Sequence, residues 1–187
     1  MLLAGNTYSV FTNNDYRFNY TWMQPSGNHL AFNVRTCDNV HVLLSTTLLN
    51  VSSEVSYEVV IGGYDNTISD IRRGAHGPIL VQVDTPNIMK CDEFLPFWIK
   101  WENSAIMVGS GVLGSNIIMQ YSESNMASNF VATVSSWTTA PAEYHFLESE
   151  GKGIIAFLNV SLSLYMSCEQ CKILKSIYLS NFSFLLC

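Results

Sequence analysis

Residues 31–45 read AFNVRTCDNVHVLLS, and this stretch decides the fold class. In its first part apolar and polar residues alternate, so Phe32 and Val34 lie on one side of an extended chain and Asn33 lies on the other. The pair Asp38-Asn39 then favours a tight turn, and the run that follows is rich in valine and leucine. The stretch therefore predicts two β-strands joined as a hairpin.

Short runs of the same kind continue along the chain from Tyr8 to about Phe146. Each is rich in β-branched or aromatic residues and ends at polar, glycine or proline residues. They lie at residues 18–23, 57–61, 79–83, 97–101, 105–108, 116–121 and 130–137. The region has no long 3.6-residue period of the kind that predicts a capped helix. The pattern predicts an all-β protein, a two-sheet antiparallel β-sandwich that occupies residues 8–150.

Residues 151–187 have a different character. Their two apolar runs, 154–164 and 177–187, are shorter than the ~20 apolar residues that a helix needs to span a bilayer. We therefore expect an irregular C-terminal extension over residues 151–187 and no membrane span.

Composition and charge narrow the class of protein. The chain has 187 residues, of which 48% are hydrophobic, so it has enough apolar material for the core of one ordinary domain and is not intrinsically disordered. With 9 Lys+Arg against 15 Asp+Glu, its formal net charge is −6. That balance lacks the basic surface that binds phosphate groups, so we expect no nucleic acid partner.

Cysteines and glycosylation sequons bear on the compartment. The five cysteines are an odd number, so at least one is unpaired or joined to another chain. Sequons of the form Asn-x-Ser/Thr occur at Asn19, Asn50, Asn159 and Asn181. The first residues lack the basic start and apolar run of a signal peptide, so the chain is either cytosolic or a piece of a longer protein. The sequons and cysteines favour a longer extracellular protein, glycosylated at Asn19 and Asn50.

The segment Gly109-Ser-Gly-Val-Leu-Gly114 has the G-x-G-x-x-G spacing of a nucleotide-type cofactor site. Such glycines let the backbone approach a dinucleotide or S-adenosylmethionine at the start of a helix. The residues that follow are β-branched and predict a strand in place of that helix. We therefore expect a glycine-rich connection between two strands and no cofactor.

The other motifs with chemical potential are isolated. Cys168 and Cys171 have the spacing of a redox dithiol or half a zinc site, without a second pair to complete it. The segment Asp65–Asp70 offers oxygen ligands but does not match the pattern of a calcium loop. The four histidines are separated from one another and from any nucleophile motif. No catalytic residue and no metal site is predicted.

Two adjacent arginines, Arg72 and Arg73, are notable in a chain with so few basic residues. They can pair with Asp65 or Asp70 and fix the loop, or they can present forked donors to an anionic or sugar ligand.

Residues 97–101 also allow two interpretations. Phe97, Ile99 and Trp101 face one way along an extended chain, whereas Trp98 and Lys100 face the other. One interpretation is that these aromatic residues fill the interior of the sandwich. The other is that Trp98 or Trp101 lines a ligand surface.

An ordered series of motifs resembles the farnesoic acid O-methyltransferase-type domain. The series consists of Y-E-(apolar)3-G-G starting at Tyr57, an Asn followed by Ser-x-Ile-Arg ending at Arg72, F-W-I-x-W at 97–101 and V-G-x-G at 108–111. The resemblance covers about residues 16–146 and implies a galectin-like jelly-roll sandwich. This type of domain recurs in arthropod proteins and as a module of extracellular proteins related to complement and alpha-2-macroglobulin.

The resemblance has implications for activity and for the cysteines. The family name implies S-adenosylmethionine-dependent methyl transfer to farnesoic acid, but the sequence offers no site for that cofactor. Extracellular members carry cysteines at the positions of Cys37 and Cys91, which implies a disulfide between them and secretion. The chain has Tyr144 where the family pattern implies a tryptophan.

We therefore predict a non-catalytic recognition module that binds carbohydrate or protein. A sheet face with aromatic and polar side chains suits sugars, because a pyranose has an apolar face and a hydroxyl edge. The candidate ligand-binding residues are Asn66, Arg72, Trp101 and Glu102. The alternatives are an O-methyltransferase acting on farnesoic acid and a structural spacer that positions neighbouring domains of a longer parent chain.

Overall fold

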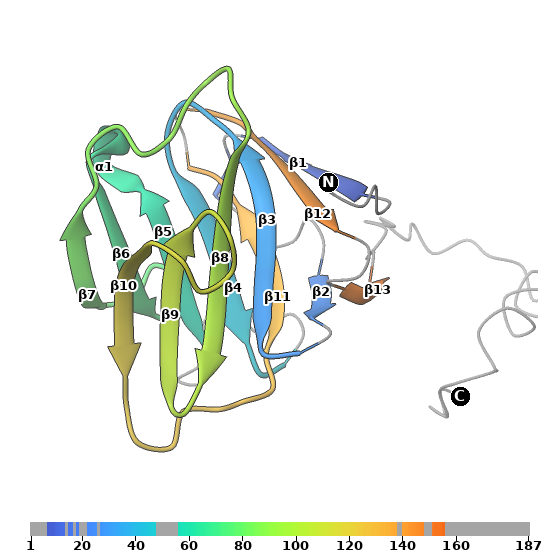
Figure 1. Cartoon of the computed structure of the whole chain (residues 1–187), viewed down its shortest axis with the longest axis vertical. Coiled ribbons are helices and arrows are strands. Elements are labelled where there is room, and N and C mark those ends of the chain that lie inside the picture. The colour runs from blue at the N-terminus through green and yellow to red at the C-terminus, as the bar shows by residue number, and fades with distance from the viewer. Residues whose placement is uncertain are drawn as a thin grey trace, which may run out of the picture. The chain divides into compact units, whose positions relative to one another are not determined.

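The computed structural model describes residues 7–13, 15–16, 18, 22–25, 27–47, 56–137, 140–147 and 151–155, all in one compact unit (Figure 1). Their strands form two antiparallel sheets. The six-stranded sheet has the order β1 (Thr7–Thr12), β12 (Ala142–Leu147), β3 (His29–Arg35), β8 (Leu95–Glu102), β9 (Ala105–Ser110) and β10 (Ile117–Ser122). The seven-stranded sheet has the order β13 (Gly151–Ile155), β2 (Trp22–Pro25), β11 (Val131–Ser135), β4 (Val40–Ser45), β5 (Tyr57–Gly62), β6 (Ile68–Arg73) and β7 (Ile79–Asp84). The predicted all-β, two-sheet antiparallel sandwich is confirmed.

The hydrophobic core lies between these two sheets, with the six-stranded sheet in front in Figure 1. On β3 the side chains of Leu30, Phe32 and Val34 are buried, and the residues between them are more exposed. Val42 of β4 and Val59 of β5 belong to the same core from the opposite sheet. Removing each such side chain from water stabilises the fold by about 1.5–3 kcal/mol, so the two-residue alternation of the sequence specifies which face of each strand is internal.

The hairpin predicted over residues 31–45 is wrong. β3 pairs with β12 and β8, whereas β4 pairs with β11 and β5, so the chain passes from one sheet to the other at residues 36–39. The side chains of Asp38 and Asn39 do not close a two-residue turn. They accept hydrogen bonds from the backbone N–H groups of Asn66 and Trp137, at 3.1 and 2.7 Å. Because both partners are distant in the sequence, the chain crosses from one sheet to the other where the local sequence predicts a hairpin.

The hairpin around residues 97–108 is as predicted. β8 pairs with β9, and Asn103 and Ser104 turn the chain with φ of 50° and 59°, the left-handed values of a tight hairpin turn. Phe97, Ile99 and Trp101 belong to the core, which confirms the first of the two interpretations for these three side chains.

Trp98 lies on the other face of β8 and is also buried, beneath the loop that follows β9. Its indole Nε1–H donates to the carbonyl oxygen of Ser115 at 3.0 Å. Gly109 lies against the ring, so that a Cβ at this position would meet the Trp98 side chain at 2.2 Å. Gly111 and Gly114 then adopt φ of 80° and 85° in the turn before β10. The glycine-rich motif is therefore a connection between two strands, as predicted, and it packs over a tryptophan.

Several predictions concern the ends of the chain. Residues 151–155 form β13, which pairs with β2. The remaining residues of the predicted extension, 156–187, lie outside the described part of the chain, as do Cys168, Cys171 and the predicted glycosylation sites Asn19 and Asn50. The division into a domain at 8–150 and an extension at 151–187 therefore stays a prediction. Among the described residues, no helix has the length and apolar character needed to cross a membrane.

Candidate functional site

The outer face of the seven-stranded sheet carries an unusual set of buried polar residues. All residues of β4 and β5 are buried, although only one face of each strand points into the core. On the other face lie His41 of β4, Glu58 of β5, and Asp70 and Arg72 of β6, all at most 9% exposed. Buried polar groups require hydrogen-bond partners, so this face must be covered and its groups paired.

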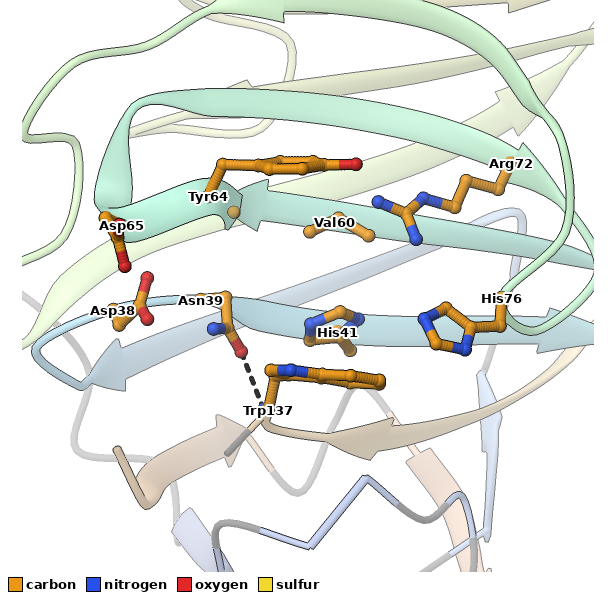
Figure 2. Close-up of a pocket in the computed structure, with 10 residues that line it drawn as sticks. Asp38, Asn39, His41, Val60, Tyr64, Asp65, Arg72, His76 and Trp137 are labelled. Atoms are coloured by element: carbon orange, nitrogen blue, oxygen red, sulfur yellow. Dashed lines mark hydrogen bonds between the residues drawn. The ribbon is translucent and has the colours of Figure 1, made fainter. Parts of the chain in front are cut away.

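A cavity of about 360 Å³ lies on this outer face of the sheet, between the sheet and residues such as Tyr64, His76 and Trp137 (Figure 2). Figure 2 shows the rings of Tyr64 and Trp137 on opposite sides of this space, with Arg72 and His76 at one end and Asp38 at the other. The complete set of lining residues is Asp38, Asn39, His41, Val60, Gly63, Tyr64, Asp65, Arg72, His76 and Trp137.

One wall of the cavity is a single left-handed turn, α1 (Gly63–Asn66), between β5 and β6. Tyr64, Asp65 and Asn66 have φ of 51°, 57° and 59°, values that side chains with a Cβ adopt at a cost of about 1–2 kcal/mol each. The turn is closed by the Thr67 N–H, which donates to the Gly63 carbonyl at 3.0 Å. This backbone leaves the Tyr64 side chain 61% exposed beside the cavity. Strained residues of this kind concentrate at functional sites, because other contacts must hold them in place.

The opposite wall is built around Trp137. Its backbone N–H donates to Asn39 Oδ1, and its ring centroid lies 4.5 Å from that of Tyr16 and 4.6 Å from that of His76. His41 lies next to it, with a centroid distance of 6.3 Å. The indole is therefore held by an aromatic cluster on one side and is accessible to the cavity on the other.

Glu58 is the polar anchor beneath this cluster. Its carboxylate accepts from Tyr16 Oη at 2.7 Å and from the His76 backbone N–H at 2.6 Å, and it contacts His41 Nδ1 at 2.6 Å. Burial raises the pKa of Glu58, but the bonds from His41, Tyr16 and the His76 backbone outweigh burial and hold the pKa of this carboxyl below its ordinary value. Burial, together with the adjacent Glu58, raises the pKa of Tyr16 well above its ordinary value, so its hydroxyl remains a donor.

Arg72 is fixed by a two-pronged ion pair with Asp70. Its Nε and Nη2 donate to the two carboxylate oxygens at 2.7 and 2.9 Å, and this pairing raises the pKa of the guanidinium although burial opposes it. The predicted pairing of Arg72 with Asp70 is therefore confirmed, but both residues lie on β6, so the pair fixes the Arg72 side chain and not a loop. Because Nη1 takes no part in the pair and Arg72 lines the cavity, the same side chain also offers a donor to a ligand.

Cys37 and Cys91 form the disulfide that the family resemblance implied, with Cα atoms 4.0 Å apart. Cys37 directly precedes Asp38 and Asn39, which line the cavity. Within the described residues, no group of three or more His, Cys, Asp or Glu side chains is arranged to hold a metal ion.

Residues 12–150 match the model of the family described as farnesoic acid O-methyl transferase. This chain belongs to that family. A curated relative, Uncharacterized protein 5 of Haliotis asinina, is 33% identical over 108 residues. The match covers 57% of this chain and 61% of the relative, so this farnesoic acid O-methyltransferase-type chain spans about three fifths of the relative's length.

Two solved structures are similar to this farnesoic acid O-methyltransferase-type domain. The galectin LEC-6 of Caenorhabditis elegans aligns with a TM-score of 0.46 and 9% identity, over 76% of this chain and 95% of the galectin. The carbohydrate binding module CBM66 of Bacillus subtilis aligns with a TM-score of 0.45 and 8% identity, over 75% of this chain and 77% of the module.

In this farnesoic acid O-methyltransferase-type domain, the four predicted ligand residues do not come together. Arg72 lines the cavity, whereas the Asn66 side chain bonds to the backbone of Met89 behind the left-handed turn. Trp101 is 2% exposed in the core, where its Nε1–H donates to the Ser128 carbonyl. Glu102 lies on the six-stranded sheet and forms an ion pair with Lys100.

Sequence reasoning missed Tyr64, Trp137, His41 and His76, which line the cavity with Arg72. A partial signal was present, because His41 and Glu58 are polar residues inside strands that are otherwise apolar. A polar residue at the second position of an apolar strand indicates an outer face that is covered and hydrogen-bonded. Trp137 carries no such signal, because its position depends on the crossover at residues 36–39.

Proposed function

We propose that this domain is a non-catalytic recognition module and that it binds carbohydrate in the cavity on the outer face of the seven-stranded sheet. The observation that carries the proposal is the cavity of about 360 Å³, which has an aromatic ring on each of two opposite sides and charged groups at both ends. A pyranose has apolar C–H faces that pack on aromatic rings and a rim of hydroxyls that form hydrogen bonds. Tyr64 and Trp137 supply the rings.

The polar groups of the cavity match the hydroxyl rim of a sugar. Arg72 and His76 provide hydrogen-bonding nitrogen atoms at one end, and the carboxylates of Asp38 and Asp65 provide acceptors at the other. A sugar hydroxyl both donates and accepts, so it can use either end. The ion pair with Asp70 fixes Arg72 in advance, so binding costs little side-chain entropy.

The family name alone does not assign methyl transfer to this chain. The glycine-rich motif at residues 109–114 leads from β9 into β10 and packs over Trp98, so its glycines serve the fold. We therefore prefer recognition to catalysis.

We also propose an extracellular location. The disulfide between Cys37 and Cys91 supports it, because such bonds form and persist mainly in oxidising compartments. The partner would then be a glycan outside the cell, carried on a protein or free.

A glycan array with matched variants tests the proposal. Trp137→Ala and Tyr64→Asn each remove one ring, and asparagine tolerates the left-handed backbone of position 64. We expect each to lose at least about tenfold in affinity, since a stacked ring is worth about 1.4 kcal/mol or more. Phe11→Ala is the control, because Phe11 is 65% exposed on the six-stranded sheet and away from the cavity. If no glycan is retained by the oxidised wild type, or if Phe11→Ala weakens binding as much as the ring variants do, the proposal is wrong.

A further inference from the structure

The two ends of the Cys37–Cys91 disulfide lead to two different walls of the cavity. We propose that this disulfide positions those walls relative to each other, so that its reduction loosens the cavity and weakens ligand binding. The binding part of this inference rests on the proposed function, whereas the positioning part rests on the structure of the walls.

On one side, Cys37 lies in the crossover at residues 36–39, directly before the two residues of it that line the cavity. Asp38 and Asn39 follow Cys37 directly; both line the cavity, and each side chain accepts a backbone hydrogen bond. Asn39 Oδ1 accepts from the Trp137 backbone N–H at 2.7 Å. A shift of Cys37 therefore moves the Asp38 end of the cavity and the backbone that carries the Trp137 ring.

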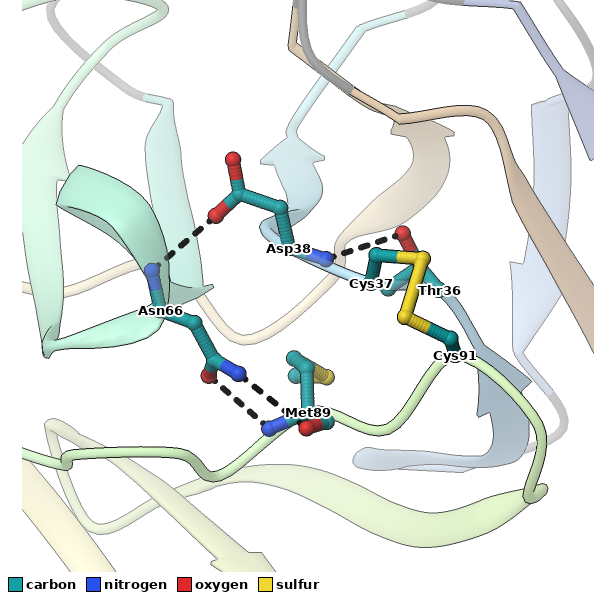
Figure 3. The surroundings of a disulfide bond; sticks show 6 residues. All are labelled: Thr36, Cys37, Asp38, Asn66, Met89 and Cys91. Atoms are coloured by element: carbon teal, nitrogen blue, oxygen red, sulfur yellow. Dashed lines mark hydrogen bonds between the residues drawn. A yellow bond between two sulfur atoms is a disulfide. The ribbon is translucent and has the colours of Figure 1, made fainter.

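On the other side, Cys91 ends the segment that supports the left-handed turn (Figure 3). Two residues before it, Met89 exchanges two hydrogen bonds with the Asn66 side chain: Nδ2 donates to the Met89 carbonyl at 3.1 Å, and the Met89 N–H donates to Oδ1 at 2.9 Å. The Asn87 N–H donates to the Asn66 carbonyl at 2.7 Å. These bonds hold Asn66 at a φ of 59°, and through it they hold the turn that presents Tyr64.

The two sides also meet through a hydrogen bond. The Asn66 backbone N–H donates to Asp38 Oδ1 at 3.1 Å, which closes a ring through Met89, Cys91 and Cys37 (Figure 3). In this ring the disulfide is the covalent cross-link between the chain segments, and the other cross-links between them are hydrogen bonds. In our proposal Asn66 is therefore a positioning residue, in place of the ligand-contacting residue that the sequence predicted.

The packing beneath the turn adds a constraint. Gly62 has a φ of 70°, and a Cβ at this position would meet the Met89 side chain at 2.8 Å. The Met89 segment thus fits directly under the turn, so a displacement of the segment cannot leave the turn unchanged. Both cysteines are exposed, so a reductant in solution reaches the bond.

The experiment compares oxidised and reduced protein by amide hydrogen exchange and by affinity. The probes are the methyl glycosides of galactose, glucose, mannose and N-acetylglucosamine. On reduction with a phosphine we expect the amides of Asn66, Met89 and Trp137 to lose at least about fivefold more protection than the core amide of Val59, whose loss reports the fall in global stability when the 54-residue loop is opened. We expect the affinity for any glycoside that binds the oxidised protein to fall by a similar factor.

Three variants locate the effect. Cys37→Ser/Cys91→Ser is expected to exchange like the reduced wild type and not to respond to the reductant. A variant with serine at Cys168, Cys171 and Cys187 is expected to respond fully, which excludes the other thiols. Asn66→Ala keeps the disulfide but removes both side-chain bonds to Met89, so it is expected to speed exchange at Met89 in the oxidised protein.

The outcomes separate this inference from the proposed function. Unchanged exchange at Asn66 and Trp137, with cleavage of the disulfide verified by mass spectrometry, would overturn the positioning role. Equal loss of protection at Val59 would also overturn it, because the bond would then stabilise the whole domain equally. Local loosening without binding of any glycoside to the oxidised protein would support the positioning role and contradict carbohydrate recognition.

Discussion

At the residue scale, the cavity depends on one buried carboxylate. Glu58 contacts Tyr16, His41 and the backbone of His76, and these three residues form the aromatic cluster that holds Trp137. The sequence shows Glu58 only as an acidic residue inside an apolar strand. Its role was not predictable because its three partners come from separate segments and meet only after the sheet has formed.

Glu58→Gln is expected to lower the free energy of unfolding at pH 7 by about 1–3 kcal/mol, because the amide cannot accept all three bonds of the carboxylate. The pKa of Glu58 is lowered in the folded state, so its charge contributes stability above the ordinary glutamate pKa of about 4.3, and that contribution is lost as the pH falls below this value. Urea unfolding between pH 7 and 3 should therefore show the wild type losing more stability than the variant. The control is Glu93→Gln, since Glu93 is exposed. Parallel pH profiles for wild type and Glu58→Gln would contradict the role of the charge.

At the element scale, the alternation of apolar and polar residues predicted the strands but did not predict which sheet each strand joins. β3 and β4 follow one another along the chain, yet they lie in different sheets because Asp38 and Asn39 bond to Asn66 and Trp137. The connection after β9 was predictable as a strand-to-strand loop, because β-branched residues follow its glycines. That Trp98 packs beneath this loop was not predictable.

Gly109→Ala tests the packing of that loop. The new Cβ would meet the Trp98 ring at 2.2 Å and the Ser115 carbonyl oxygen at 2.8 Å, so we expect a loss of about 1–3 kcal/mol in the free energy of unfolding. Gly27→Ala is the matched control, because its Cβ would have no neighbour nearer than 3.8 Å, and we expect a change within about 0.5 kcal/mol. Chemical denaturation of both variants gives the comparison. Equal stabilities would show that Trp98 moves aside without cost.

At the scale of the whole described unit, the two sheets are joined at one edge of the core by a polar cluster. Tyr57 of β5 and Arg73 of β6 both bond to Glu123, which follows β10 of the opposite sheet. The Arg73 guanidinium also lies 4.6 Å from the centre of the Tyr57 ring. The sandwich itself was predictable, because period-two strands with polar turns have few other ways to bury their apolar faces. The polar cluster of Tyr57, Arg73 and Glu123, which we call the clasp, was not predictable, because Glu123 lies 66 residues after Tyr57.

The ionisation of the Tyr57 phenol in the clasp can be measured by titration. Burial raises the pKa of Tyr57 to about 12, with Glu123 adding to the effect and Arg73 opposing it. Since the folded pKa exceeds the ordinary value of about 10, the protonated phenol contributes stability below pH 10, and the contribution is lost as the pH rises from 10 to 12. The ultraviolet titration curves of the wild type and of Tyr57→Phe should differ by one phenol that ionises above pH 10. If the phenol that is lost in Tyr57→Phe ionises near pH 10 in the wild type, the clasp is contradicted.

The central claim is that Trp137, rather than Trp98 or Trp101, contacts a sugar in the cavity. The most direct measurement is a ¹⁵N–¹H spectrum of the indole N–H groups during titration with the methyl glycosides. We predict a saturable shift of the Trp137 indole signal, assigned by its loss in Trp137→Ala, while the signals of the buried Trp98 and Trp101 stay in place. A shift confined to Trp98 or Trp101, or no shift of the Trp137 signal with any glycoside, would contradict the account.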